Sequence, residues 1–465
     1  MFFFGICILI ALSAVSYRLF SLSYIQHEKY AKEAQSQQSN PALRLSRRGD
    51  ISVYDISSLK TVPIATTSKV GLDVKRVYSK GPFASQVLGF VGFQGIDRVG
   101  QYGVEGYHDD ALLDGDIVLT IDPNIQSYVE SRLNEVLRKY SSEGGTAIVQ
   151  DPKTGAILAM ASSPSFDPNH YSDYSLERYL NSNVQKQFEP GSSFKAITMA
   201  AALDTGSVTP DTTYTDTGVL EVGGYKIRNY NDESNGVQTM RQVLDKSLNT
   251  GAAFAQRRTG NDKFLNYVVG FGFSQKTGID LAGEISGNIS NLYQNRQVNF
   301  STASFGQGIA VTPLQLINAY SAIANGGKLM RPYVVKEIVY ADGTRKQTLP
   351  KIIGTPIREQ TAGTLTAMLV DVVDHGFDQG RVSGYDVAGK TGTAQIPDKV
   401  NGGYLEDNQY IHDFVGFAPA YAPRFVILLK MVRPQGIKFA SRSLSPVFSD
   451  IAEYLLRYFK IPPTR

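Results

Sequence analysis

The sequence has few of the residues that metal or disulfide chemistry requires. Cys7 is its one cysteine, so no disulfide can form within the chain and thiolate metal clusters are excluded. The five histidines are scattered and lack the paired spacing of metal ligands, which argues against a histidine-rich metal site. The net charge is +3, from 46 basic and 43 acidic residues, which does not suggest a nucleic-acid partner.

Charged side chains are absent from the first 17 residues, MFFFGICILIALSAVSY. As a helix this segment would be roughly 25 Å long, at the short end for a membrane span. A cleaved signal peptide is an alternative, because residues 11–13 resemble a cleavage site, but no positive residue precedes the apolar run. A buried core helix at a terminus is rare. We therefore expect an uncleaved transmembrane anchor at 1–17, although the basic residues follow it, the reverse of the positive-inside expectation for an N-in anchor.

The rest of the chain shows no internal repeat and divides into three further regions. Residues 18–40 predict a helical stalk with a polar end, and residues 41–120 show short alternating runs cut by glycine, typical of a small β-rich module. Residues 121–465 begin with a helical pattern and two strand-like runs joined by a hairpin turn. A helical middle (about 192–330), further strands and a final helix follow. This order predicts one α/β (α+β) domain whose sheet closes late in the chain.

Two adjacent serines precede a lysine at a predicted helix start, in EPGSSFKAITMAAALDTG (189–206). A serine hydroxyl needs a base, and with few histidines and no G-x-S-x-G turn a lysine is the available one. Lys195 is three residues after Ser192 and two after Ser193, and residues three apart are neighbours on a helix. The helix N-terminus disfavours a charged ammonium and offers N–H donors to an oxyanion. Ser192 is therefore the predicted nucleophile, although Ser57–Lys60 has the same spacing in a β-type context.

A second motif, Ser247-Leu248-Asn249, falls where a helical pattern breaks and restarts. The Ser247 hydroxyl can relay a proton and the Asn249 amide can hold a peptide group, but both residue types also serve as ordinary helix N-caps. Taken alone, this motif favours the helix cap.

A third motif, Lys390-Thr391-Gly392-Thr393, lies in an apolar run that can form an inner strand. The other two Lys-Thr-Gly copies lie in a turn and a loop. Small residues around Gly392 allow another backbone to approach, and a strand edge of this kind is suited to pairing a peptide. Lys390 and the hydroxyls of Thr391 and Thr393 suit a substrate carboxylate.

The three motifs in this order form the set found in β-lactamases and penicillin-binding proteins. The sequence resembles class B penicillin-binding proteins, the monofunctional D,D-transpeptidases that cross-link peptidoglycan. The likeness extends to GTAIVQDPKTGAILAMASSPSFDPN, FEPGSSFK, TGIDLAGE, SFGQGIAVTPLQL and PVFSDIAEYLLRY. SFGQGIAVTPLQL is more similar to the septal, FtsI-type branch than to the elongation branch. In region 41–120, Arg48–Ile51 and GVEGY (103–107) resemble the non-catalytic pedestal of the family.

The resemblance implies a fold of the penicillin-binding and serine β-lactamase type over 121–465, with an antiparallel sheet and helices. It implies that Ser192 forms an acyl-enzyme with Lys195 as base, and that Ser247 relays a proton with help from Lys390. Backbone N–H groups of Ser192 and Thr393 would form the oxyanion hole. Asn249 and strand 390–394, including Gly392, would bind the stem peptide, and Thr391 and Thr393 its carboxylate.

The resemblance further implies acylation of Ser192 by β-lactams and no metal or organic cofactor. The expected location is the bacterial plasma membrane, with a single span and the catalytic domain outside the cytoplasm. The expected partners are stem peptides or their lipid-linked precursor, and by analogy an FtsW-type glycan polymerase and other division proteins.

Several rival functions share these motifs. A D,D-carboxypeptidase differs in its acceptor, and an elongation-type transpeptidase in its cellular role. A β-lactamase-like hydrolase would need no anchor or pedestal, and no glutamate motif for a deacylating water is evident between Ser192 and Lys390. A β-lactam sensor usually follows several membrane segments, and a non-enzymatic scaffold would be expected to lose a motif.

Overall fold

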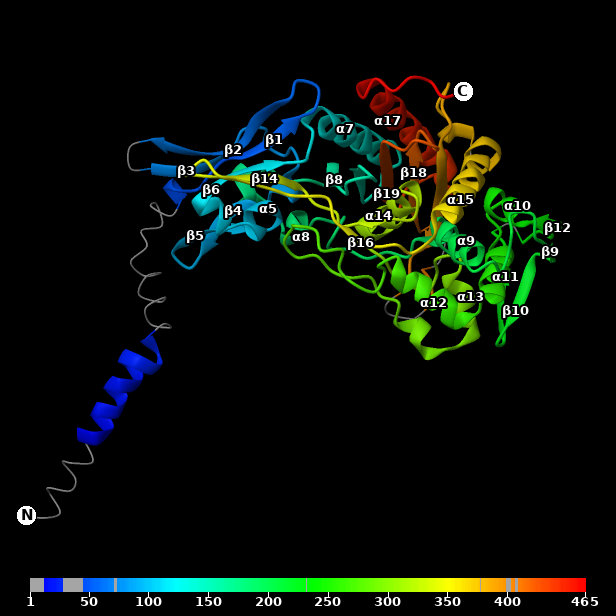
Figure 1. Ribbon diagram of the computed structural model, residues 1–465, viewed down its shortest axis with the longest axis horizontal. Helices are drawn as coiled ribbons and strands as arrows, with labels where there is room; N and C mark the ends of the chain where they lie inside the picture. Colours follow the sequence, from blue (N-terminus) through cyan, green and yellow to red (C-terminus); the bar gives the residue numbers. More distant parts are fainter. Residues whose placement is uncertain are drawn as a thin grey trace, which may run out of the picture.

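The structure of the chain is a computed structural model, shown in Figure 1. The structure describes residues 12–27, 45–70, 73–230, 232–376, 378–398, 403–405 and 409–465. Residues 12–20 are helical and continue into a π-helical turn, η1 (Ser21–Ile25). Within these described ranges, no helix combines the length and the apolar character needed to cross a bilayer. Most of the predicted anchor, and the stalk after residue 27, lie outside the described residues.

The first sheet has six strands and draws on two distant parts of the chain. Its order is β15 (Arg345–Gln347), β14 (Val335–Tyr340), β6 (Gly115–Leu119), β1 (Ile51–Asp55), β2 (Lys60–Val70) and β3 (Asp73–Tyr78). Figure 1 shows the yellow β14 among the blue and cyan strands. A hairpin of β4 (Phe90–Gln94) and β5 (Asp97–Gln101) accompanies short helices α4 (Ser85–Leu88), α5 (Gly103–Tyr107) and α6 (Ala111–Asp114). The regions predicted as 41–120 and 121–465 thus share this sheet.

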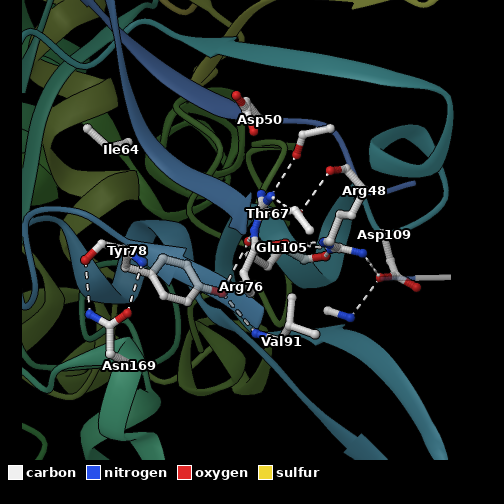
Figure 2. A network of polar contacts seen from close by, with 12 residues as sticks. Arg48, Asp50, Ile64, Thr67, Arg76, Tyr78, Val91, Glu105, Asp109 and Asn169 are labelled. Atoms are coloured by element: carbon white, nitrogen blue, oxygen red, sulfur yellow. Dashed lines mark hydrogen bonds and ion pairs between the residues drawn. The ribbon is translucent and has the colours of Figure 1, made fainter. Parts of the chain in front are cut away.

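A buried ionic network holds the pedestal-like segments together (Figure 2). Glu105 accepts from Arg48 Nε at 2.7 Å, from Arg76 Nε at 2.8 Å and from the Tyr78 hydroxyl at 3.1 Å. Asn169 bonds both the N–H and the carbonyl oxygen of Tyr78, each at 2.9 Å. Because Asn169 lies in η2 (Pro168–Asp173), beyond the six-stranded sheet, the network also joins the two regions.

The second sheet has five strands, and each neighbouring pair is antiparallel. Its order is β17 (Ala388–Gln395), β18 (Tyr410–Ala418), β19 (Phe425–Val432), β7 (Gly144–Gln150) and β8 (Ile157–Ser163). The predicted turn at 152–155 joins β7 to β8, as expected. The Lys-Thr-Gly-Thr strand, β17, lies at the edge of the sheet rather than inside it, so on one side it has no neighbouring strand among the described residues.

Helices cover both faces of this sheet. On one face pack α7 (Pro123–Lys139) and the closing helix α17 (Ser445–Tyr458), both predicted from the sequence. The N-terminus of α7 is capped by Asp122, whose carboxylate accepts from Asn124 N at 2.8 Å and Ile125 N at 3.0 Å. The opposite face packs on α14 (Pro313–Ala324), which contacts β7, β18 and β19. The nucleophile segment lies on this second side.

The prediction of a helical middle at about 192–330 is only partly right. The helices are α9 (Lys195–Asp204), α10 (Met240–Asp245), α11 (Asn249–Thr259), α12 (Asn261–Gly270), α13 (Gln297–Ala303) and α14. Two antiparallel strand pairs interrupt them, β9 (Thr213–Asp216) with β12 (Gly236–Thr239) and β10 (Val219–Val222) with β11 (Tyr225–Arg228). Gly223 and Gly224 both adopt positive φ between β10 and β11 and make the tight turn.

The remaining elements are short or connect the sheets. They are α8 (Leu176–Tyr179), η3 (Gly191–Phe194), η4 (Ser290–Gln294), β13 (Leu329–Met330), β16 (Ile352–Gly354), α15 (Glu359–Asp371), η5 (Val372–Gly376), η6 (Asp378–Gly380) and α16 (Ala440–Ser443).

Candidate active site

The predicted nucleophile lies on a tight turn rather than on the first turn of an α-helix. Gly191 opens the 3₁₀ turn η3 with φ +57°, and its N–H donates to the carbonyl oxygen of Gly306 at 3.1 Å. A Cβ on Gly306 would collide with the Gly191 backbone, so the SFGQG segment needs a glycine there. The turn runs directly into α9, and Lys195 Nζ lies 3.0 Å from Ser192 Oγ. The predicted three-residue spacing therefore brings the two groups together.

The neighbouring serine is placed differently. Ser193 is fully buried and its hydroxyl donates to the carbonyl oxygen of Pro190 at 2.9 Å. Its own carbonyl oxygen accepts from the Tyr320 hydroxyl at 2.7 Å. Ser193 therefore anchors the turn, and Ser192 is the serine that meets the lysine.

Ser247 occupies a position where glycine is the usual residue. It has φ +55° just after α10, its N–H donates to Leu244 O at 3.2 Å, and Leu248 N donates to Val243 O at 2.9 Å. These two bonds form a Schellman motif, which ends a helix with one left-handed residue. A non-glycine residue pays a conformational cost in this region, and such strain is typical of functional sites. The backbone thereby directs the Ser247 hydroxyl toward the lysines.

The Ser247 hydroxyl joins the two predicted catalytic lysines. Lys195 Nζ lies 3.1 Å from Ser247 Oγ, and Lys390 Nζ lies 3.1 Å from the same oxygen. Lys195 Nζ also donates to the Ser247 carbonyl oxygen at 2.5 Å. One continuous chain of polar contacts thus runs from Ser192 through Lys195 and Ser247 to Lys390. These residues come, in that order, from η3, α9, the turn between α10 and α11, and β17.

Burial sets the protonation of the two lysines. Lys195 and Lys390 are 1% and 0% exposed. Burial lowers the pKa of Lys195 well below its ordinary value, and the Lys390 ammonium lowers it further. Burial lowers the pKa of Lys390 to about 7, while Asp413 and Asp245 act in the opposite direction. The arrangement favours a neutral Lys195 that can accept a proton beside a Lys390 that is charged up to neutral pH.

Asp413 is a site residue that the sequence reasoning missed. It pairs with Gly392 across β17 and β18, and a Cβ on Gly392 would overlap Asp413 Oδ2 and the carbonyl oxygen of Pro190. Asp413 is fully buried, and burial raises the pKa of its carboxyl to about 7. An acid within the apolar run YIHDFVGFA was the available signal, because a buried carboxyl needs a charged or polar neighbour.

The predicted substrate-binding residues surround this chain of contacts, and Thr391 joins it through its carbonyl oxygen, which accepts from Lys390 Nζ at 3.4 Å. Asn249 begins α11, and its side-chain amide donates to Arg228 O at 2.8 Å. The Thr393 hydroxyl accepts from Ala440 N at 3.1 Å. Thr391, two residues earlier, has its side chain on the same face of β17 and is 6% exposed. The Thr393 backbone packs against Gly191, so β17 and the nucleophile turn lie side by side. In the described part of the chain, no cluster of His, Cys, Asp or Glu fits a metal ion.

The comparisons with known proteins agree with this geometry. Residues 145–453 match the family model of the penicillin binding protein transpeptidase domain. The chain belongs to the penicillin-binding protein transpeptidase family. This confirms the family predicted from the three motifs, whose residues all lie within the matched range.

Relatives and solved structures extend the likeness over most of the chain. Stage V sporulation protein D of Bacillus subtilis is 37% identical over 85% of this chain and 66% of its own length. Penicillin-binding protein PbpB of Mycolicibacterium smegmatis is 35% identical over 79% of this chain and 58% of its own. The chain thus spans less than two thirds of the length of each of these two relatives. Penicillin-binding protein 3 of Mycobacterium tuberculosis superposes with a TM-score of 0.82 at 30% identity, covering 90% of this chain and 97% of that one.

Proposed function

We propose that the chain is a serine-type peptidoglycan D,D-transpeptidase that works through an acyl-enzyme on Ser192. The observation that carries the proposal is the contact chain from Ser192 through Lys195 and Ser247 to Lys390, with each polar link at 3.0–3.1 Å. A relative from Mesostigma viride named peptidoglycan D,D-transpeptidase FtsI homolog, 30% identical to this chain, supports it. A solved relative of this family holds ampicillin, which supports acylation by β-lactams.

In the acylation step, Ser192 Oγ bonds to the carbonyl carbon of the penultimate D-alanine and its proton passes to Lys195. Burial keeps Lys195 able to accept that proton. Backbone N–H groups of Ser192 and Thr393 hold the developing oxyanion, and each such donor contributes about 3 kcal/mol. The C–N bond then breaks, and the terminal D-alanine leaves as an amine that takes its proton through Ser247.

In the second step, the amine of another stem peptide attacks the ester carbon on Ser192. The amine loses its proton to the Lys195–Ser247 pair, and Ser192 Oγ leaves with a proton. Lys390 acts earlier, in the acylation step: charged beside Ser247, it holds with Thr391 and Thr393 the terminal carboxylate of the donor stem, which departs with the released D-alanine. Binding through Thr393 requires its hydroxyl to exchange the Ala440 N–H for the ligand. Asn249 and the backbone of β17, including Gly392, align the peptide by strand pairing.

Product analysis tests this proposal against its rivals. The purified chain is given a stem-peptide donor ending in D-Ala-D-Ala and an acceptor stem with a free amine. A transpeptidase forms a cross-linked dimer together with one released D-alanine. Release of D-alanine without a dimer identifies a carboxypeptidase, and hydrolysis of penicillin with turnover identifies a β-lactamase-like enzyme. Either result contradicts the proposal.

The cellular assignment is a septal, single-pass enzyme of the bacterial plasma membrane whose catalytic region lies outside the cytoplasm. The uncharged segment 1–17 and the SFGQGIAVTPLQL segment support it. A polytopic FtsW-type glycan polymerase and other division proteins are the partners this role implies. A fluorescent fusion should concentrate at division sites, whereas an even distribution along the side wall favours an elongation role.

A further inference from the structure

A cavity lies on the same side of the five-stranded sheet as Ser192. Its volume is about 270 Å³, and its lining includes none of the predicted site residues. Part of its wall is formed by three strands, through Gly144, Gly145 and Thr146 of β7, Ser162 of β8 and Lys430 of β19. Two further basic residues, the exposed Lys186 and the half-buried Arg178, also line it.

Among the described residues, no acid contacts the ammonium of Lys430 directly, although Asp413 acts on it from the adjacent strand. Lys430 is 4% exposed and stands directly across the strands from Asp413 on one side and Thr146 on the other. In the described ranges no ion pair or hydrogen bond holds its Nζ, which lies 4.9 Å from the centre of the Phe188 ring. Asp413 turns instead toward Gly392. Burial and the nearby Lys186 lower the pKa of Lys430 to about 8, while Asp413 acts in the opposite direction, so Lys430 stays mainly charged at neutral pH.

The neighbouring hydroxyl is also unsatisfied. Thr146 is fully buried, and its Oγ1 has no hydrogen-bond partner among the described residues. Buried polar groups without partners are rare and costly, so each calls for an explanation. The hydroxyl of Ser162 is already bonded to Asn181 and Asn183. Among the described residues, the cavity wall therefore presents one ammonium without a hydrogen bond or ion pair and one hydroxyl without a hydrogen bond, from adjacent strands.

The acids in the lining do not neutralise Lys430. Glu143 pairs with Arg433 at 2.9 Å, and Glu177 is exposed. The cavity is also larger than an inorganic ion, whose share of volume is of the order of a water molecule, about 30 Å³. An ammonium beside a hydroxyl is suited to an anionic oxygen carried on a small organic group.

We propose that this cavity is a carboxylate-binding site, in which Lys430 and Thr146 hold the anionic oxygens and Lys186 adds positive charge. The carboxylate belongs either to a free small organic acid or to an acidic residue of the peptide substrate. The second source rests on the proposed function, whereas the site itself does not. The site lies one strand beyond Asp413, which in turn lies against the Lys-Thr-Gly-Thr strand.

Competitive acetylation of the full chain tests the proposal directly at Lys430. Lysines are labelled with limiting acetic anhydride at neutral pH, with succinate or with the uncharged succinamide, and adducts are quantified by peptide mass. Succinate should reduce labelling of Lys430 several-fold, while succinamide and the exposed control Lys263 show no change. Lack of protection by succinate, or equal protection by succinamide, overturns the proposal.

Two variants confirm that the effect arises in the cavity. Succinate should raise the thermal unfolding midpoint of the wild-type chain in a saturable way, and the rise should disappear in Lys430→Met but persist in Lys263→Met. If Lys430→Met fails to fold, Thr146→Val removes only the hydroxyl and should weaken the protection of Lys430. An unchanged succinate response in both cavity variants places the anion elsewhere and overturns the proposal.

The two sources of the carboxylate are separated by the ligand used. An acyl-D-Ala-D-Ala stem peptide with an acidic residue is compared with its side-chain amide, in the Ser192→Ala variant so that no acylation occurs. Protection of Lys430 by the acidic peptide alone identifies the substrate as the source, and protection by succinate alone identifies a free acid. Absence of protection by both contradicts the site. Penicillin labelling of Ser192 is scored separately, so failure of the proposed function is distinguishable.

Discussion

Ser247 combines a strained backbone with the central hydroxyl of the site. Its φ of +55° is a conformation that glycine adopts without cost, and its Oγ lies 3.1 Å from the Nζ atoms of both predicted catalytic lysines. The sequence alone left open whether this serine was a helix cap. The structure explains its identity, because a glycine would satisfy the helix end but provide no hydroxyl.

Replacing Ser247 separates stability from activity. Ser247→Gly and Ser247→Ala both remove the hydroxyl, so each should slow acylation by penicillin about 100-fold or more. Only the glycine variant relieves the left-handed strain, so it should be about 1 kcal/mol more stable than the alanine variant. Denaturant unfolding and stopped-flow acylation measure the two effects. Equal stabilities of the two variants would show that the position is unstrained.

The pH dependence of acylation should reveal the charge on Lys390. Its pKa of about 7 means that the charge is present below neutral pH and is lost as the pH rises through 7, so the acylation rate should fall on the alkaline side. Burial opposes this charge, while Asp413 and Asp245 favour it.

Asp413→Asn removes one negative neighbour of Lys390 and should move the alkaline limb of the profile to lower pH. The exposed control Asp342→Asn should leave the profile unchanged. Second-order acylation rates measured from pH 5 to 9 provide the comparison. A limb that stays in place or moves upward in Asp413→Asn would mean that Asp413 does not act on Lys390.

The contact between β17 and η3 depends on glycines that no side chain can replace. Gly392 faces the Pro190 carbonyl oxygen and the Asp413 carboxylate, and Gly191 faces the Thr393 backbone. The sequence predicted a strand with small residues at 388–394 and a turn before Ser192. It did not predict that these two elements pack directly on each other.

Gly392→Ala should push β17 away from the nucleophile turn. Overpacking of this kind costs about 1–3 kcal/mol, and acylation should fall with it because Lys390 moves away from Ser247. The same substitution at Gly363, in α15 with no atom near the added carbon, should instead stabilise the chain by about 0.5–1 kcal/mol. Equal effects at both positions, measured by thermal unfolding and penicillin acylation, would contradict the close approach.

Local patterns explain which elements were predictable. The periodicity of α7 and α17 and the turn between β7 and β8 follow from neighbouring residues, and so does the contact between Ser192 and Lys195. The strand pairs between 213 and 239 were missed because helical patterns flank them on both sides. The strands β14 and β15 join the first sheet, and Asp413 lies opposite Gly392, through pairings between segments that are far apart in the sequence. Such pairings leave no local pattern from which they could be predicted.

The two sheets are linked through the network centred on Glu105. This carboxylate, fully buried, holds two buried guanidiniums, and Tyr78 continues the network to Asn169. The burial of so many charges in one place makes the pedestal-like region sensitive to loss of the single acid, because removal of one partner leaves uncompensated charge.

Glu105→Gln should therefore destabilise the first sheet strongly. Leaving Arg48 and Arg76 without their carboxylate should cost about 3–5 kcal/mol, whereas Glu453→Gln, in an exposed pair with Arg457, should cost less than about 0.5 kcal/mol. Thermal unfolding and limited proteolysis of region 45–120 report the change. Similar stabilities for the two variants would show that the network is not a structural link.

The identity of the nucleophile is tested most directly by locating a penicillin adduct. The purified chain is labelled with a reporter penicillin, digested, and the modified peptide is sequenced by mass spectrometry. We predict a single adduct on Ser192, lost in Ser192→Ala and retained in Ser193→Ala, because the Ser193 hydroxyl is buried against Pro190. An adduct on Ser193, or no adduct on the folded chain, would contradict the assignment of Ser192 as the acylated residue.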